Sequence, residues 1–128
     1  MTKLLLVEDN EMNRDMLGRR LQRHGYNMCF AVDGAEGVAK AGSEMPDLIL
    51  MDVALGEMDG WEATKLIKGN PQTAGIPVIA LTAHAMATDR EISVKVGCSE
   101  YDTKPVDMPR LLSKIQYCLD LRRSRLAT

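Results

Sequence analysis

The strongest constraint on the fold of this chain is a regular alternation of short apolar runs with longer amphipathic stretches. Residues 4–7, 48–51 and 78–81 are continuously apolar, as are strands that helices cover on both faces of a sheet. Further β-type runs lie at residues 28–31 and 100–103, and helix-length stretches separate the runs. This alternation is typical of α/β proteins built on a parallel sheet.

The element boundaries follow from this pattern. We predict strands at residues 4–7, 28–31, 48–52, 78–82 and 100–103, and helices at about 11–24, 35–43, 60–68, 86–96 and 108–122. Helix stops are expected where glycines follow amphipathic stretches, at Gly25, Gly69 and Gly97. The sequence therefore predicts an α/β fold, a doubly wound five-stranded parallel sheet flanked by five helices, in a single domain over residues 1–128.

Charge and hydropathy exclude several function classes. The 16 Lys and Arg residues are balanced by 18 Asp and Glu residues, so no basic field exists to attract nucleic acid or an acidic membrane surface. The apolar run at residues 4–7 ends at Glu8 and Asp9, and it is too short for a signal peptide or a membrane span. We expect a cytoplasmic monomer whose partners are small molecules or proteins.

Polar side chains follow the carboxyl ends of four predicted strands. They are Glu8 and Asp9, Asp52, Thr82, and Lys104. In an open parallel sheet the ligand site lies beyond these ends. Three carboxylates close together repel one another unless a cation neutralises them, and an all-oxygen donor set favours a hard ion such as Mg²⁺. Taken singly, Asp9 could instead cap the following helix, and Lys104 could be a solvated charge.

Four motifs, in this order and at these spacings, resemble the response-regulator receiver family. They are Val7-Glu8-Asp9-Asn10, Asp52 with Met58-Asp59-Gly60, Leu81-Thr82-Ala83, and Lys104-Pro105. The resemblance covers nearly the whole chain and implies a flavodoxin-like fold with strand order 2-1-3-4-5. It implies that Asp52 is the phosphoacceptor. The implied ligands of Mg²⁺ or Mn²⁺ are Glu8, Asp9, Asp52 and the backbone carbonyl of Ala54, and the implied phosphoryl contacts are Thr82, Lys104 and the amide of Ala83.

The same resemblance implies a switch and a set of partners. Tyr101 matches an aromatic residue that moves inward when Thr82 moves toward the phosphoryl group, and Pro105 matches a proline preceded by a cis peptide bond. Signal would leave through the face made by the fourth helix, the fifth strand and the fifth helix. The donor would be a histidine kinase or a histidine phosphotransfer protein, and the reader a downstream effector protein. The chain would then be a stoichiometric phosphoacceptor with slow self-dephosphorylation, not primarily an enzyme.

Other functions remain open on this fold. A receiver-fold interaction module that acts without phosphorylation would be favoured by loss of an acidic-site residue, and none is missing here. A Mg²⁺-dependent phosphatase with an Asp nucleophile would resemble a D-x-D arrangement, but position 54 is Ala. A flavodoxin-like FMN protein would carry a Ser-, Thr- and Gly-rich phosphate loop where this chain has Glu-Asp-Asn-Glu. A receiver segment of a hybrid histidine kinase would look the same.

The remaining side chains that stand out are given structural roles. Helical spacing predicts that Met12, Met16 and Leu17 pack in the core, and Trp61 is expected there as well. Gly56 stands where the family usually has proline, which should loosen the loop after Asp52.

Three further groups are read in the same way. We interpret His84, one of two variable positions beside the implied phosphoryl site, as solvated or packed. Arginines crowd the ends of the first and last helices, where cations complement the helix dipole. The cysteines are odd in number and widely spaced, which favours buried reduced thiols over a disulfide framework: Cys29, Cys98 and Cys118.

Overall fold

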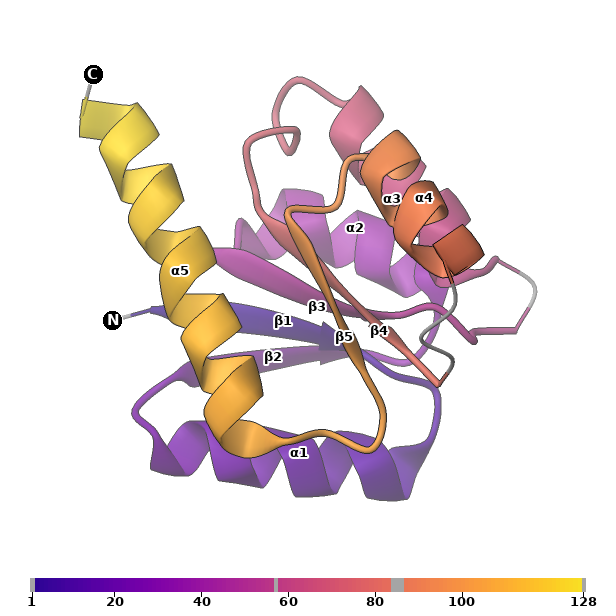
Figure 1. Cartoon of the computed structure of the whole chain (residues 1–128), viewed down its shortest axis with the longest axis vertical. Helices are drawn as coiled ribbons and strands as arrows, with labels where there is room; N and C mark the ends of the chain where they lie inside the picture. Colours follow the sequence, from indigo (N-terminus) through magenta and orange to yellow (C-terminus); the bar gives the residue numbers. More distant parts are fainter. Residues whose placement is uncertain (1, 57, 84–86, 128) are drawn as a thin grey trace.

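The computed structural model describes residues 2–56, 58–83 and 87–127, which form one parallel sheet with helices on both faces (Figure 1). The sheet has five strands in the order β2-β1-β3-β4-β5. The strands are β1 (Lys3–Val7), β2 (Asn27–Ala31), β3 (Leu48–Asp52), β4 (Val78–Thr82) and β5 (Glu100–Thr103). The helices are α1 (Glu11–Arg23), α2 (Gly34–Glu44), α3 (Gly60–Gly69), α4 (Ala87–Val96) and α5 (Met108–Ala127). The predicted fold class and strand order are confirmed.

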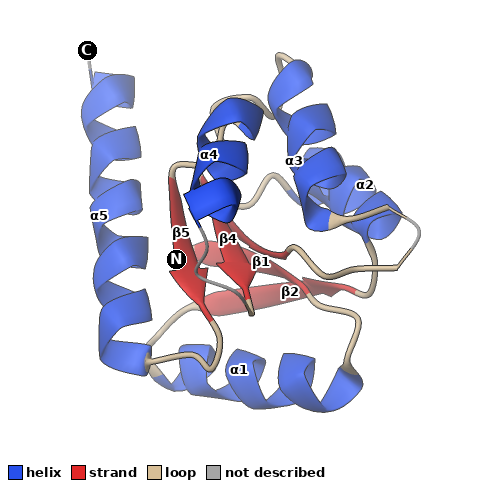
Figure 2. Cartoon of the chain, turned by 45° about the vertical axis from the view of Figure 1, so that its right-hand side comes forward, coloured by secondary structure: helices blue, strands red, loops and turns tan. Residues whose placement is uncertain are grey.

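Two hydrophobic layers explain why the central strands are apolar throughout. Successive side chains of a strand point to opposite faces. Leu4 and Leu6 of β1 accordingly belong to the layer under α1 and α5, whereas Leu5 and Val7 belong to the layer under α2 and α3. Figure 2 shows α4 beside α3, and α5 beside the edge strand β5. Both faces of the sheet are therefore covered, and its carboxyl edge is left for the polar residues.

Most element boundaries agree with the sequence prediction, and α5 is the exception. It ends at Ala127 instead of residue 122. No Gly or Pro interrupts residues 123–127, so nothing in the local sequence stops the helix. Arg122 also ties it to the loop before β3, because its Nη1 donates to the carbonyl oxygen of Asp47 at 2.9 Å. Gly25 and Gly97 have positive φ angles of 91° and 95°, which confirms them as helix stops.

The predicted core role of the methionines in α1 is wrong. Met12 is 76% exposed and Met16 is 55% exposed. The helix instead turns Gly18 and Leu21 toward the sheet, with Leu17 packed beside them. Helical spacing shows that a row of apolar side chains shares a face, but two such rows run along α1 and spacing alone does not say which one is buried.

The side chains that were expected to be buried are only partly so. Trp61, at the start of α3, is half-buried. Cys29 and Cys98 are also half-buried, whereas Cys118 is buried. Burial raises the pKa of both Cys98 and Cys118 to about 11, which keeps these thiols protonated and unreactive. His84 and residue 86, the predicted start of the fourth helix, lie outside the described residues.

Candidate functional site

Three carboxylates meet at the carboxyl edge of the sheet. Glu8, Asp9 and Asp52 each offer an oxygen within 4.8 Å of the others. They meet because β1 and β3 are parallel neighbours, so the residues that end one strand lie beside those that end the other. Glu8 and Asp52 are 5% and 2% exposed, whereas Asp9 faces solvent. This all-oxygen group, open on one side, suits a hard divalent cation that keeps some of its water.

Lys104, which directly follows the edge strand β5, reaches the same group of carboxylates. Its Nζ lies 3.0 Å from Glu8 Oε1 and 3.0 Å from Asp52 Oδ2. The lysine is brought there by β5, and its backbone N–H donates to the carbonyl oxygen of Thr82 on β4 at 2.7 Å. The structure thus brings together the charged residues that the sequence singled out at three different strand ends.

Burial and charge shift the pKa values of Glu8 and Lys104 in opposing ways. Burial, followed by the nearby Asp52 carboxylate, raises the pKa of Glu8 to about 7 even though Lys104 opposes the shift. Burial by itself lowers the pKa of Lys104, but the two carboxylates more than offset this and raise it above its ordinary value. Lys104 alone therefore does not return the pKa of Glu8 to its ordinary value, and a divalent ion bound beside these carboxylates would reduce the repulsion between them.

Asp52 is held in place by its own loop. Its Oδ1 accepts a hydrogen bond from the backbone N–H of Ala54 at 3.1 Å, which leaves Oδ2 for Lys104. The helix α3 begins against this loop, and a Cβ on Gly60 would lie only 2.3 Å from the carbonyl oxygen of Asp52. Asp59 caps α3 by accepting from the Glu62 N–H at 2.8 Å. The Asp-Gly pair after Asp52 therefore seats α3 against the site.

The predicted switch residues lie on β4 and β5. Thr82 is buried at the end of β4, and its hydroxyl donates to Asp89 Oδ2 of α4 at 3.3 Å. Ala83 follows it and is exposed. Tyr101 is half-buried on β5, with Arg90 and Lys114 each 5.4 Å from the centre of its ring. Tyr101 therefore lies outside the acidic group, beside the helices that flank β5.

Comparison with known proteins agrees with this geometry. The model of the response regulator receiver domain matches residues 4–116. The chain belongs to the response-regulator receiver family. Among curated relatives, the polar-differentiation response regulator DivK of Brucella ovis is 40% identical over 117 residues, which cover 91% of this chain and 95% of DivK.

Solved receivers share the fold. The chemotaxis protein CheY4 of Vibrio cholerae is 31% identical, with a TM-score of 0.87 over 92% of this chain and 98% of CheY4. The receiver domain of a Pseudomonas aeruginosa sensor histidine kinase is 34% identical, with a TM-score of 0.86 over 93% of this chain and 98% of that one. That domain holds a magnesium ion coordinated in its active-site cleft. In the part of this receiver that the structure describes, no helix has the length and apolar character needed to cross a membrane.

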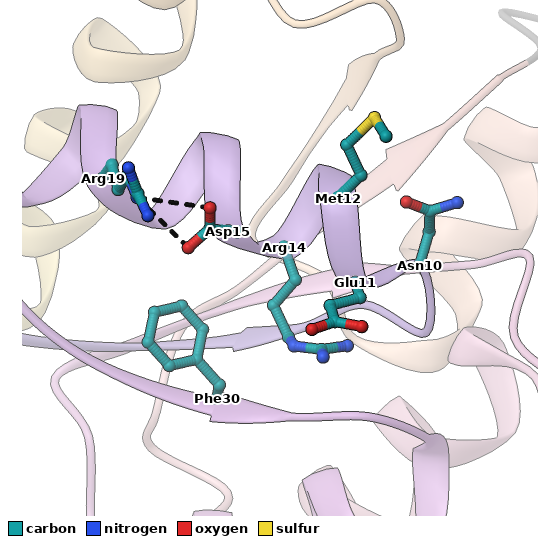
Figure 3. A pocket seen from close by; sticks show the side chains of 7 residues that line it. All are labelled: Asn10, Glu11, Met12, Arg14, Asp15, Arg19 and Phe30. Atoms are coloured by element: carbon teal, nitrogen blue, oxygen red, sulfur yellow. Dashed lines mark hydrogen bonds and ion pairs between the residues drawn. The ribbon is translucent and has the colours of Figure 1, made fainter.

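The sequence reasoning missed two residues that support the site. Arg14 of α1 donates from Nη1 to the carbonyl oxygen of Glu8 at 2.9 Å, and Figure 3 shows its side chain extending from α1 on the side where Phe30 of β2 lies. Asp89 accepts the Thr82 hydrogen bond described above, although an acidic residue in a first helical turn usually only complements the dipole. The capping alternative for Asp9 is excluded, because Asn10 caps α1 by accepting from the Asn13 N–H at 2.9 Å.

The remaining predicted positions are placed as follows. The peptide bond between Lys104 and Pro105 is cis. Ala54 and Gly56 are exposed in the loop after β3.

Proposed function

We propose that this receiver accepts a phosphoryl group on Asp52 from a phosphohistidine of a histidine kinase or a histidine phosphotransfer protein. The observation that carries the proposal is the position of Asp52. Its carboxylate is buried, lies within 4.8 Å of two further carboxylates, and is paired with Lys104 at 3.0 Å. A carboxylate in these surroundings can act as a nucleophile only when cations screen the incoming phosphate.

The transfer balances without a further reactant. An Asp52 oxygen forms a bond to phosphorus as the bond from phosphorus to the donor imidazole nitrogen breaks, and that nitrogen keeps the electron pair. The Lys104 ammonium takes up negative charge on the transferring oxygens, and the Ala83 amide and Thr82 hydroxyl fix the product. The chain is thereby modified once per event and serves as a stoichiometric acceptor; slow hydrolysis of the acyl phosphate would reset it.

The residues present fit a divalent cation. Glu8, Asp9 and Asp52 would hold Mg²⁺ or Mn²⁺ through oxygen, together with the backbone carbonyl of Ala54. When bound, the ion supplies charge neutralisation on the phosphoryl oxygens. Of the three side chains, Asp9 is the exposed one, whereas Glu8 and Asp52 are the two that Lys104 pairs with. We therefore assign direct coordination to Asp9 and a supporting role to Glu8.

The readout would lie on the face made by α4, β5 and α5. A phosphoryl group adds about 1.5 to 2 negative charges and three acceptor oxygens, which would draw Thr82 and Lys104 toward Asp52. Tyr101 would then move into the space behind Thr82. Exposed apolar side chains on the two flanking helices, Val94 at 72% and Tyr117 at 58%, offer an effector protein a contact surface.

We propose that residues 1–128 act as one cytoplasmic receiver unit.

Phosphorylation itself is the test. The protein is incubated with Mg²⁺ and acetyl phosphate, and its intact mass is measured. We expect the mass of one added phosphate in the wild type and none in Asp52→Ala. Asp15→Ala, which removes an exposed carboxylate on α1, is the matched control and should be modified like the wild type. Full modification of Asp52→Ala would contradict the assignment, and no modification of the wild type would favour the phosphorylation-independent interaction module.

A second test concerns the metal. Asp9→Asn keeps the shape of the side chain but removes its charge, so its affinity for Mg²⁺ in a calorimetric titration should fall at least about tenfold. Equal affinity in the variant and the wild type would show that Asp9 is not a ligand.

A further inference from the structure

A second charged cluster is built on Asp102, two residues before Lys104. Asp102 of β5 is 2% exposed and faces α5, which covers it with Arg110 and Lys114. The Arg110 Nε lies 2.7 Å from Asp102 Oδ1, and the Lys114 Nζ lies 3.7 Å from the same oxygen. Because Asp102 pairs in register with Leu81, this carboxylate sits in the apolar layer under α1 and α5.

The cluster is poorly arranged if its purpose is stability. Within the described part of the chain, Asp102 Oδ2 is buried without a hydrogen-bond partner, while Oδ1 accepts from both Arg110 and the Thr103 N–H. An arginine can bind both oxygens of a carboxylate, and that arrangement would satisfy Oδ2. A buried ion pair with an unsatisfied oxygen contributes less to folding stability than a well-packed apolar pair would.

Among the residues that the structure describes, Asp102 Oδ2 lacks a hydrogen bond because the Nη2 of Arg110 is directed elsewhere. Its Nη2 donates to the carbonyl oxygen and to the hydroxyl of Thr103, each at 3.3 Å. Lys114 does the same one turn later, with its Nζ 2.6 Å from the carbonyl oxygen of Tyr101. The two cations of α5 therefore hold the main chain of β5 on the residues that lead directly into Lys104.

We infer that Asp102 and Arg110 are positioning residues for Lys104. Together they form a clamp that holds the main chain at the end of β5, so that the Lys104 ammonium stays between Glu8 and Asp52. Asp102 orients the guanidinium, and the guanidinium fixes Thr103, whose next residue reaches the acidic group. This inference rests on the proposed function in one respect, because it treats Lys104 as the group that assists phosphoryl transfer.

The test removes the clamp without changing net charge. In Asp102→Leu/Arg110→Met both charges are replaced by apolar groups, so the melting temperature should stay equal or rise. Freed from the clamp, Lys104 would spend less time beside Glu8 and Asp52, and Mg²⁺ would meet less repulsion there. We expect a several-fold lower dissociation constant for Mg²⁺ by calorimetry, and a slower reaction with acetyl phosphate. In a Lys104→Ala background the same double change should have no effect on Mg²⁺ binding.

Two controls separate the clamp from general effects. Asp15→Ala/Arg19→Ala removes another Asp–Arg pair, 3.2 Å apart and exposed on α1 (Figure 3), and should leave Mg²⁺ binding unchanged. Arg110→Lys keeps the charge but lacks the planar fork that reaches Asp102 and Thr103 together, so it should resemble the double variant.

Amide hydrogen exchange of Lys104 decides the matter without metal or phosphate. Its N–H donates to the Thr82 carbonyl oxygen, and a loosened strand end should exchange at least about tenfold faster in the double variant. Unchanged exchange of the Lys104 N–H in the double variant would by itself overturn the clamp, whatever the Mg²⁺ affinity does. If the wild type accepts no phosphoryl group, the proposed function fails, while exchange still judges the clamp.

Discussion

At the scale of single residues, Gly60 is a position where a methyl group cannot be accommodated. A Cβ there would meet the Asp52 carbonyl oxygen at 2.3 Å and the Val53 Cα at 2.7 Å, and both are backbone atoms that cannot move aside cheaply. Gly60→Ala should therefore lower the free energy of unfolding by about 1 to 3 kcal/mol or more. Gly42→Ala is the matched control, because nothing lies within 4 Å of its Cβ in α2. It should be stabilising by about 0.4 to 1 kcal/mol in urea titrations.

Glu8 gives a second residue-scale prediction, for the protein without divalent cations. Its pKa is raised from 4.5 to about 7 by folding, so between these values the folded state binds more protons than the unfolded state. The contribution of Glu8 to stability should therefore fall as the pH rises from about 4.5 to 7 and level off above that. Glu8→Gln resembles the protonated form and should lack this dependence. The difference in unfolding free energy between the two proteins in EDTA should change by roughly 1 to 3 kcal/mol across the window; a flat difference would contradict the prediction.

At the scale of elements, α1 presents two apolar rows with different roles. Leu21 is fully buried against the sheet, whereas Met16 is 55% exposed. Leu21→Ala should cost about 2 to 5 kcal/mol of unfolding free energy, because a buried side chain leaves a cavity. Met16→Ala should stay within about 0.5 kcal/mol of the wild type, as exposed substitutions do. Comparable losses in the two variants would mean that the methionine row also packs against the protein.

At the scale of the whole molecule, the sequence contains the fold because each central strand carries its own evidence of burial on both faces. The strand ends converge by topology alone, so Glu8, Asp9, Asp52 and Lys104 could be grouped before any coordinates. The burial of α1 could not be predicted, since Met12 and Met16 repeat with the same spacing as Leu17 and Leu21. The roles of Arg14, Asp89 and Arg110 could not be predicted either. Each is an ordinary charged residue on a helix, and the partner of each residue lies outside that helix.

The last prediction concerns communication between the acidic group and α4. Thr82 is the connecting residue, because it ends β4 beside Asp52 and its hydroxyl reaches Asp89 in the first turn of α4. A phosphoryl group on Asp52 would compete for that hydroxyl and release Asp89. This would shift the equilibrium between the two positions of α4 and between the outward and inward positions of the Tyr101 ring. Beryllofluoride with Mg²⁺ should therefore change the amide chemical shifts of α4 in the wild type and in Thr82→Ser, which keeps a hydroxyl. In Thr82→Ala the α4 shifts should change much less, although beryllofluoride still binds at Asp52. Equal responses in Thr82→Ala and the wild type would rule out the route through Thr82, and an α4 that never responds would place the output surface elsewhere.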